Sequence, residues 1–155
     1  MSEAEITHPP KSATASSRQY QLYVTIVSMA GVVLAVLGLM QLTREELTGF
    51  LLLALLAVAI QGTATVTLRG VDFSVASAVS LAAIALFGPA PAALIAIIAE
   101  SALWLISIRM DHPPWKKAVT RLGFNSGMTA LATFIAGLCF VLLHSWLGKV
   151  WRHWL

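Results

Sequence analysis

The stretch from Phe73 to Ala99 runs for 27 residues without a charged side chain, and this feature strongly limits what the chain can fold into. A second uncharged run, Leu22 to Leu42, is 21 residues long. A helix of that length spans about 30 Å, which is the thickness of the hydrocarbon core of a bilayer. Runs of this length and polarity are typical of transmembrane helices.

The composition of the chain agrees with this interpretation. Apolar residues make up 58% of the 155 residues and charged residues 11%, against about 25% charged residues in soluble domains. The mean hydropathy is +0.82. These values exclude a disordered chain, a disulfide-rich secreted domain and a soluble enzyme with one core. The single cysteine, Cys139, excludes an internal disulfide and a thiolate metal cluster.

The basic residues predict an orientation rather than a nucleic-acid partner. The net charge of +3 and the pI near 9.4 are explained by Lys and Arg that stay in cytoplasmic loops. With the N-terminus inside, seven basic residues lie inside and three outside. The inner ones are Lys11, Arg18, Arg69, Arg109, Lys116, Lys117 and Arg121, and the outer ones are Arg44, Lys149 and Arg152. We therefore expect a bacterial inner-membrane protein with a cytoplasmic N-terminus and an outer C-terminus.

The sequence predicts an all-α, polytopic membrane protein with three parts. Residues 1–21 are expected to be a disordered cytoplasmic tail, residues 22–143 a transmembrane bundle, and residues 144–155 an amphipathic tail. The tail places tryptophans on one helical face, which predicts a separate helix lying on the membrane surface. About five transmembrane helices are expected, at 22–42, 47–66, 73–87, 91–108 and 116–143. The third is short for a complete span, so we expect one of its ends to be sunk in protein.

Local signals set the expected helix boundaries. The sequence from Thr43 to Glu46 matches a capping box and predicts a tight turn into the second helix. The segment Gly88-Pro89-Ala90-Pro91 predicts a break between two helices, because proline lacks a backbone donor. Alternating threonines at Thr63, Thr65 and Thr67 predict an extended piece that is too short and isolated for a sheet.

No catalytic or metal-binding pattern is present. The sequence lacks GxSxG, HExxH, GxxxxGK[ST] and GxGxxG motifs. None of the four histidines shares a helix face with a carboxylate at metal-ligand spacing. We therefore expect neither an enzyme nor a cofactor or metal.

A group of polar residues predicted within the membrane forms the candidate ligand pocket. Glu100 is expected near the midplane, where an ionised and unpaired carboxylate is costly. Asn125 lies at a similar depth on the antiparallel fifth helix, and the side chain of Arg121 is long enough to reach toward Glu100. The full candidate set is Glu100, Asn125, Arg121, Trp104, Gln61 and Asp72. The same residues could instead only hold helices together, and the sequence leaves this alternative open.

Small residues predict close helix packing. Gly123 and Gly127 form a GxxxG pattern, which lets two helices approach closely. Ser74, Ser77 and Ser80 on the third helix suit the same purpose.

Two stretches carry a resemblance to a known family. The first is Val71-Asp72-Phe73-Ser74 with the following segments 81–89 and 92–94, and the second is Trp115-Lys116-Lys117-Ala118 with Phe124-Asn125. Over about Leu47 to Leu143 the chain resembles the N-terminal membrane region of bacterial HD-GYP and GGDEF signalling proteins. It is also distantly similar to the S components of energy-coupling-factor vitamin transporters. The resemblance implies sensing or ligand binding in the membrane without turnover.

Three roles are consistent with these features. The first is a sensory, ligand-binding membrane module whose partner is a cytoplasmic output domain. The second is the substrate-binding component of a transporter, and the third is a small structural subunit of a larger membrane complex. The expected partners are the lipid bilayer, a small-molecule ligand and other membrane subunits, and we expect no nucleic acid. The sequence is expected to be either the membrane region of a longer protein or a stand-alone relative.

Overall fold

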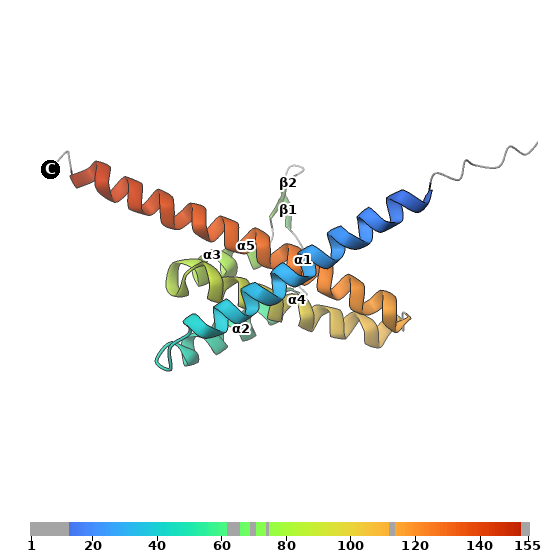
Figure 1. The fold of residues 1–155 in the computed structure, drawn as a ribbon. Helices are drawn as coiled ribbons and strands as arrows, with labels where there is room; N and C mark the ends of the chain where they lie inside the picture. Colours follow the sequence, from blue (N-terminus) through green and yellow to red (C-terminus); the bar gives the residue numbers. More distant parts are fainter. Residues whose placement is uncertain (1–12, 62–65, 69–70, 74, 112–113, 153–155) are drawn as a thin grey trace, which may run out of the picture.

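The computed structural model describes the backbone of residues 13–61, 66–68, 71–73, 75–111 and 114–152, and the side chains of residues 18–60, 77–105 and 114–147. Within these ranges the fold is helical, as predicted, with one small antiparallel hairpin (Figure 1). The elements are α1 (Ala13–Gln41), α2 (Leu47–Gln61), β1 (Val66–Leu68), β2 (Val71–Phe73), α3 (Val75–Phe87), α4 (Pro89–Asp111) and α5 (Trp115–Arg152).

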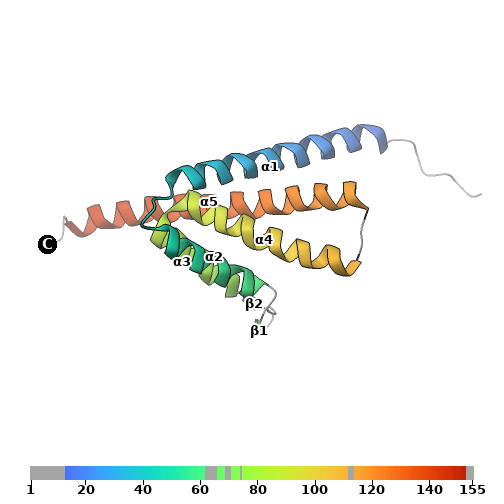
Figure 2. The same cartoon turned by 90° about the horizontal axis from the view of Figure 1, so that it is seen from below.

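Helix α4 is the centre of the fold, and each of the other four helices packs against it. Helices α1 and α5 lie side by side and run in the same direction, while α4 runs in the opposite direction (Figure 2). Glycines set the distances between these three helices. Gly31 lies against Gly127 between α1 and α5, and Gly38 lies against Ala90 between α1 and α4. Gly137 of α5 lies against Pro89 of α4, so the three helices approach to backbone contact.

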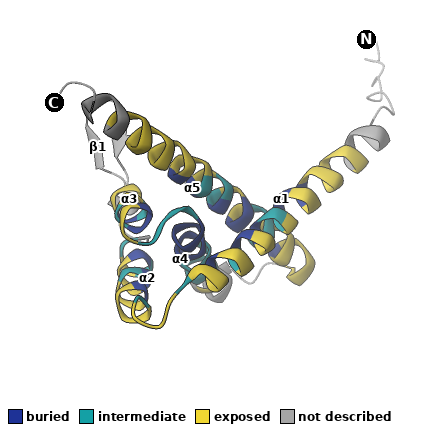
Figure 3. Cartoon of the chain, turned by 60° about the vertical axis from the view of Figure 1, so that its left-hand side comes forward, coloured by how far each residue is buried: buried dark blue, intermediate teal, exposed yellow. Residues whose placement is uncertain are grey.

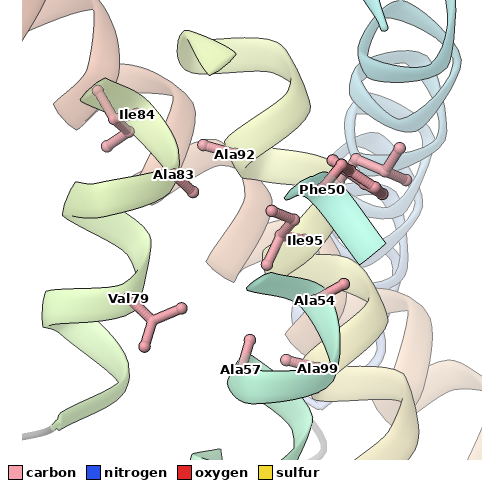
Figure 4. Close-up of a cluster of buried hydrophobic side chains, with 10 residues drawn as sticks. Phe50, Ala54, Ala57, Val79, Ala83, Ile84, Ala92, Ile95 and Ala99 are labelled. Carbon is pink, nitrogen blue, oxygen red and sulfur yellow. The ribbon is translucent and has the colours of Figure 1, made fainter. Parts of the chain in front are cut away.

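The buried core consists mainly of small side chains, and many large apolar side chains face outward. Helices α2, α3 and α4 bring Ala54, Ala57, Ala83, Ala92 and Ala99 together around Ile95 (Figure 4). Exposed residues cover the outer surfaces of the helices (Figure 3). They include leucines of α2 that are more than half exposed, namely Leu51, Leu52 and Leu55. In soluble domains such leucines are usually buried, whereas small residues at helix interfaces are typical of membrane bundles.

Helices α3 and α4 meet at a single residue, Gly88. Its φ of 88° lies in the left-handed region, which glycine adopts without steric cost. The Gly88 N–H donates to the Ile84 carbonyl (3.0 Å), and the Ala92 N–H donates to the Gly88 carbonyl (3.2 Å). Gly88 thus ends one helix and begins the next. The predicted break is confirmed, but Pro89 and Pro91 lie within the first turn of α4, where their missing N–H groups are not needed.

The turn between α1 and α2 contains the predicted contact between Thr43 and Glu46. The Glu46 carboxylate accepts hydrogen bonds from the Thr43 N–H (3.1 Å) and the Thr43 hydroxyl (2.8 Å). Because these donors favour the charged carboxylate, they lower the pKa of Glu46. The Phe50 N–H donates to the Glu46 carbonyl (2.8 Å), so Glu46 also starts the helical hydrogen-bonding pattern.

Three expectations about the elements were wrong. The extended piece after α2 does form a sheet, because β2 supplies a partner strand in the register Val66↔Phe73, Thr67↔Asp72 and Leu68↔Val71. The helix predicted to begin at Leu22 begins at Ala13, so part of the predicted disordered tail is helical. The predicted separate surface helix from His144 is the continuation of α5, which runs unbroken for 38 residues to Arg152 because no proline interrupts it.

Two of the described helical segments are long and apolar enough to cross a membrane. They are Arg18–Gln41 and Trp115–Leu147. Helices α2 and α3, with 15 and 13 residues, measure about 22 and 20 Å and are shorter than the bilayer core of about 30 Å. The described part of the fold therefore contains two candidate spans by length and composition, rather than five.

Candidate ligand cleft

A cleft of about 440 Å³ opens beside α4, between α3 and α5. Helices α3 and α5 contact each other little, and α4 lies between them. The lining residues come from four helices: Ala57 of α2, Ser77, Ser80, Leu81 and Ile84 of α3, Ile95, Ala96 and Ala99 of α4, and Thr129, Ala132, Thr133 and Ala136 of α5. The volume falls within the range of about 300–1,000 Å³ that is typical of ligand pockets.

The chemistry of the cleft is apolar with a few hydroxyl groups. Ser77 and Ser80 place hydroxyls on the α3 side, and Thr129 and Thr133 place them on the α5 side. Most of the other lining residues are alanines, which leave open space because they are small. Such a cleft accommodates an apolar body and offers hydrogen bonds at its two sides.

A stripe along α5 forms one wall of the cleft. Thr129, Ala132, Thr133 and Ala136 follow one another at helical spacing, so they share a face of the helix. Thr133 is only 8% exposed, and Ala132 and Ala136 are exposed at the open side. In sequence these residues resemble a helix-packing stripe. They line a cleft because α3 diverges from α5, and the local sequence gives no signal of that divergence.

Two of the predicted pocket residues lie at one end of the lining. Glu100 is partly buried and directly follows the lining residue Ala99 on α4, while Asn125 is exposed and precedes the lining residue Thr129 by four residues on α5, about 6 Å along the helix axis. Because α4 and α5 run in opposite directions, both residues lie toward the same end of the cleft. The cleft therefore has a polar end.

The other predicted pocket residues have different surroundings. Trp104 is partly buried on α4 and does not line the cleft. Arg121 is exposed and lines another pocket, together with Tyr20 of α1. The side chains of Gln61 and Asp72 lie outside the described residues, although the Asp72 backbone pairs with Thr67.

The glycine pair Gly123 and Gly127 lies at the contact between α1 and α5. A Cβ atom at Gly127 would collide with the carbonyl group of Val27, and one at Gly123 would lie 3.0 Å from the Ser28 hydroxyl oxygen. The contact continues through Tyr23, whose ring packs edge-on against Phe124 (5.6 Å between ring centroids). Gly123 and Gly127 thus occupy a helix–helix contact and not the cleft.

A second, smaller cavity of about 120 Å³ lies between α1, α4 and α5. It is lined by Ser126, whose buried hydroxyl has no hydrogen-bond partner among the described residues. Its size is sufficient for a few water molecules and not for a ligand the size of the main cleft.

The described residues contain no group of three or more His, Cys, Asp or Glu side chains placed to hold a metal ion. Comparisons of the chain with protein-family models, with curated proteins and with solved structures find no match.

Proposed function

We propose that this chain is a membrane-embedded module that binds a small amphiphilic molecule in the cleft between α3 and α5. The observation that carries the proposal is the cleft itself: about 440 Å³, lined mainly by alanines and hydroxyl side chains. An apolar part of the ligand fits the alanine-lined walls. A polar group at the end of the ligand fits the end of the cleft near Glu100 and Asn125.

The arrangement of the helices supports placement in a membrane. Helices α1 and α5 run in the same direction, so a chain that crosses the bilayer with both must return between them. Helix α4 runs the other way, and its 23 residues measure about 34 Å, so its length matches the bilayer core for the return. The shorter α2 and α3 enter the bilayer as a hairpin beside α4 and bring the number of membrane helices to five.

The basic residues support the orientation. Arg18, Lys116, Lys117 and Arg121 are all exposed at the end of the bundle where α1 and α5 begin. At the opposite end, the α1–α2 turn carries Arg44 beside Glu45 and Glu46. By the positive-inside rule the first end faces the cytoplasm of a bacterial inner membrane.

Reporter fusions after Leu155 test this orientation. We expect an alkaline phosphatase fusion, which is active only outside the cytoplasm, to be active, and a green fluorescent protein fusion to be dark. Bright fluorescence with an inactive phosphatase would overturn the orientation and imply an even number of crossings.

The role of such binding is proposed from the resemblance described above. The region from Leu47 to Leu143, which resembles the membrane part of bacterial signalling proteins, contains the whole cleft. We therefore propose a sensory input, in which occupancy of the cleft is reported to a cytoplasmic output domain.

Native mass spectrometry of the detergent-extracted protein tests the binding proposal. We expect the wild-type chain to retain a small molecule and the Ala132→Phe variant to lose it, because the new ring fills the open side of the cleft. Ala85→Phe is the matched control, since Ala85 is also exposed but does not line the cleft. Glu100→Gln tests the polar end of the cleft. If this variant folds but no longer retains the small molecule, binding of the ligand requires the charge of the Glu100 carboxylate.

A wild-type chain that carries no retained molecule, or a variant pair that behaves alike, would refute ligand binding in the cleft. The structural-subunit role has its own observation in its favour, the row of exposed leucines on α2. In that case the spectra would show a partner subunit on the wild-type chain and no small molecule.

A further inference from the structure

A basic pocket at the starts of α1 and α5 is separate from the ligand cleft. It measures about 410 Å³ and is lined by Tyr20 of α1 and by Lys116, Lys117, Thr120 and Arg121 of α5. Both Tyr20 and the neighbouring Trp115 are mostly exposed, at 61% and 71%. No residue of this pocket lines the cleft between α3 and α5.

The pocket concentrates positive charge that its own lining does not neutralise. Three of the five lining residues are cations and none is a carboxylate. The pocket also lies at the N-terminus of α5, whose first turn contains no acidic residue. The helix dipole therefore adds positive potential at the same place. Arg121 supplies a planar group that can bind two oxygens of a phosphate, and the two lysines supply compact charges.

We propose that this pocket binds the phosphate group of an anionic phospholipid in the cytoplasmic leaflet. The lipid source, rather than a soluble phosphate, is favoured by what lies next to the pocket. Tyr23, one helical turn after Tyr20 on α1, and Val119, next to Thr120 on α5, are both exposed, so acyl chains have a surface to cover near the pocket. Aromatic residues among basic ones are typical of the headgroup level of a bilayer. The proposal rests on the membrane placement proposed above and not on occupancy of the cleft.

Titration of the detergent-purified full chain with defined lipids, followed by native mass spectrometry, tests the site. We expect phosphatidylglycerol to bind at least about tenfold more tightly than zwitterionic phosphatidylethanolamine, because each basic residue contributes to attraction of an anionic headgroup. Replacing Lys116, Lys117 and Arg121 together by Gln is expected to abolish this preference. Ala132→Phe, which fills the ligand cleft, is expected to leave it unchanged, so failure of the cleft proposal and failure of the lipid site are distinguishable.

A charge-matched variant separates a site from net charge alone. Arg44, Lys149 and Arg152 replaced together by Gln remove the same charge outside the basic pocket, and the lipid preference is expected to persist. Equal loss in both triple variants would overturn the proposal, as would a wild-type chain with no preference. A final titration uses inorganic phosphate. If inorganic phosphate binds the wild-type chain while phosphatidylglycerol binds no more tightly than phosphatidylethanolamine, the pocket binds soluble phosphate and the lipid assignment is wrong.

Discussion

The two sides of α4 are built in different ways. On one side, α1 and α5 approach α4 and each other through glycines, to the point of backbone contact at Gly31, Gly38, Gly127 and Gly137. On the other side, side chains set the spacing of the α2–α3 hairpin, as in the edge-on contact of Phe50 and Phe87 (6.1 Å between ring centroids). The contact region of α1, α4 and α5 has little room for adjustment, whereas the packing of the α2–α3 hairpin leaves the cleft open between α3 and α5. The comparison indicates a rigid three-helix frame with a more adaptable wall attached to it.

The largest expected effect comes from adding one methyl group at the glycine contact between α1 and α5. In Gly127→Ala the new Cβ would collide with the backbone of Val27, so α1 and α5 must separate along their contact. We expect a loss of about 2 kcal/mol or more in stability, by analogy with overpacked cores. Thermal unfolding in detergent, followed by circular dichroism, measures the effect as a lower midpoint temperature.

Gly49→Ala is the matched substitution in the adaptable region. Its Cβ would lie 3.4 Å from the Phe87 ring, which is ordinary van der Waals contact. Alanine also favours a helix over glycine by about 1 kcal/mol, so this variant is expected to be as stable as the wild type or more so. If Gly127→Ala and Gly49→Ala lowered the stability equally, the distinction between a rigid frame of α1, α4 and α5 and an adaptable wall of α2 and α3 would be wrong.

A smaller effect is expected at the junction of the two regions. Gly88→Ala meets no atom within 4 Å, so its cost arises only from the left-handed backbone at φ 88°. That cost is about 1–2 kcal/mol. Gly88→Asn should cost less, since asparagine tolerates this conformation better. If the unfolding midpoints of the two variants were the same as that of the wild type, the backbone at Gly88 would not constrain the junction.

The smallest expected effect lies in the exposed turn between α1 and α2. The lowered pKa of Glu46 means that its charged form stabilises the folded state. This stabilisation is present above the ordinary carboxyl pKa and is lost as the pH falls through the lower folded pKa. The unfolding midpoint of the wild type should therefore exceed that of Glu46→Gln at pH 6, and the difference should shrink as the pH falls below 4. A constant difference across this range would exclude the Thr43–Glu46 contact as its source.

Much of the helical layout could be predicted from sequence, because its signals are local. An uncharged run of bilayer length predicts α1, and the Gly88–Pro91 segment predicts the α3–α4 break. The errors occurred in two situations. In one, a local pattern paired with a segment that the pattern itself does not indicate; in the other, the sequence pattern changed without a helix-breaking residue. Strand β1 forms a sheet only because β2 pairs with it, and the change in sequence pattern at His144 does not end α5.

The candidate site could be predicted only in part, for a geometric reason. Depth along a helix follows from residue counting, which predicted Glu100 near the midplane and Asn125 at a similar depth. Which residues line a cavity depends on the divergence of whole helices, which residue counting does not give. Ser77 and Ser80 were therefore predicted to be packing residues, although they line the cleft, and Thr133, which also lines it, was not singled out.

The unbroken length of α5 has a mechanical consequence. With 38 residues it is a rod of about 57 Å that forms a wall of the cleft at Thr129–Ala136 and then extends well beyond the other helices (Figure 2). A rod transmits tilt, so a rotation of about 5° at the cleft displaces the helix end near Arg152, about 24 Å away, by about 2 Å. In the orientation proposed above, a ligand that changes the spacing of α3 and α5 would thus displace the outer end of α5, and the opposite displacement of its first turn at Trp115 would carry the change to the cytoplasmic side.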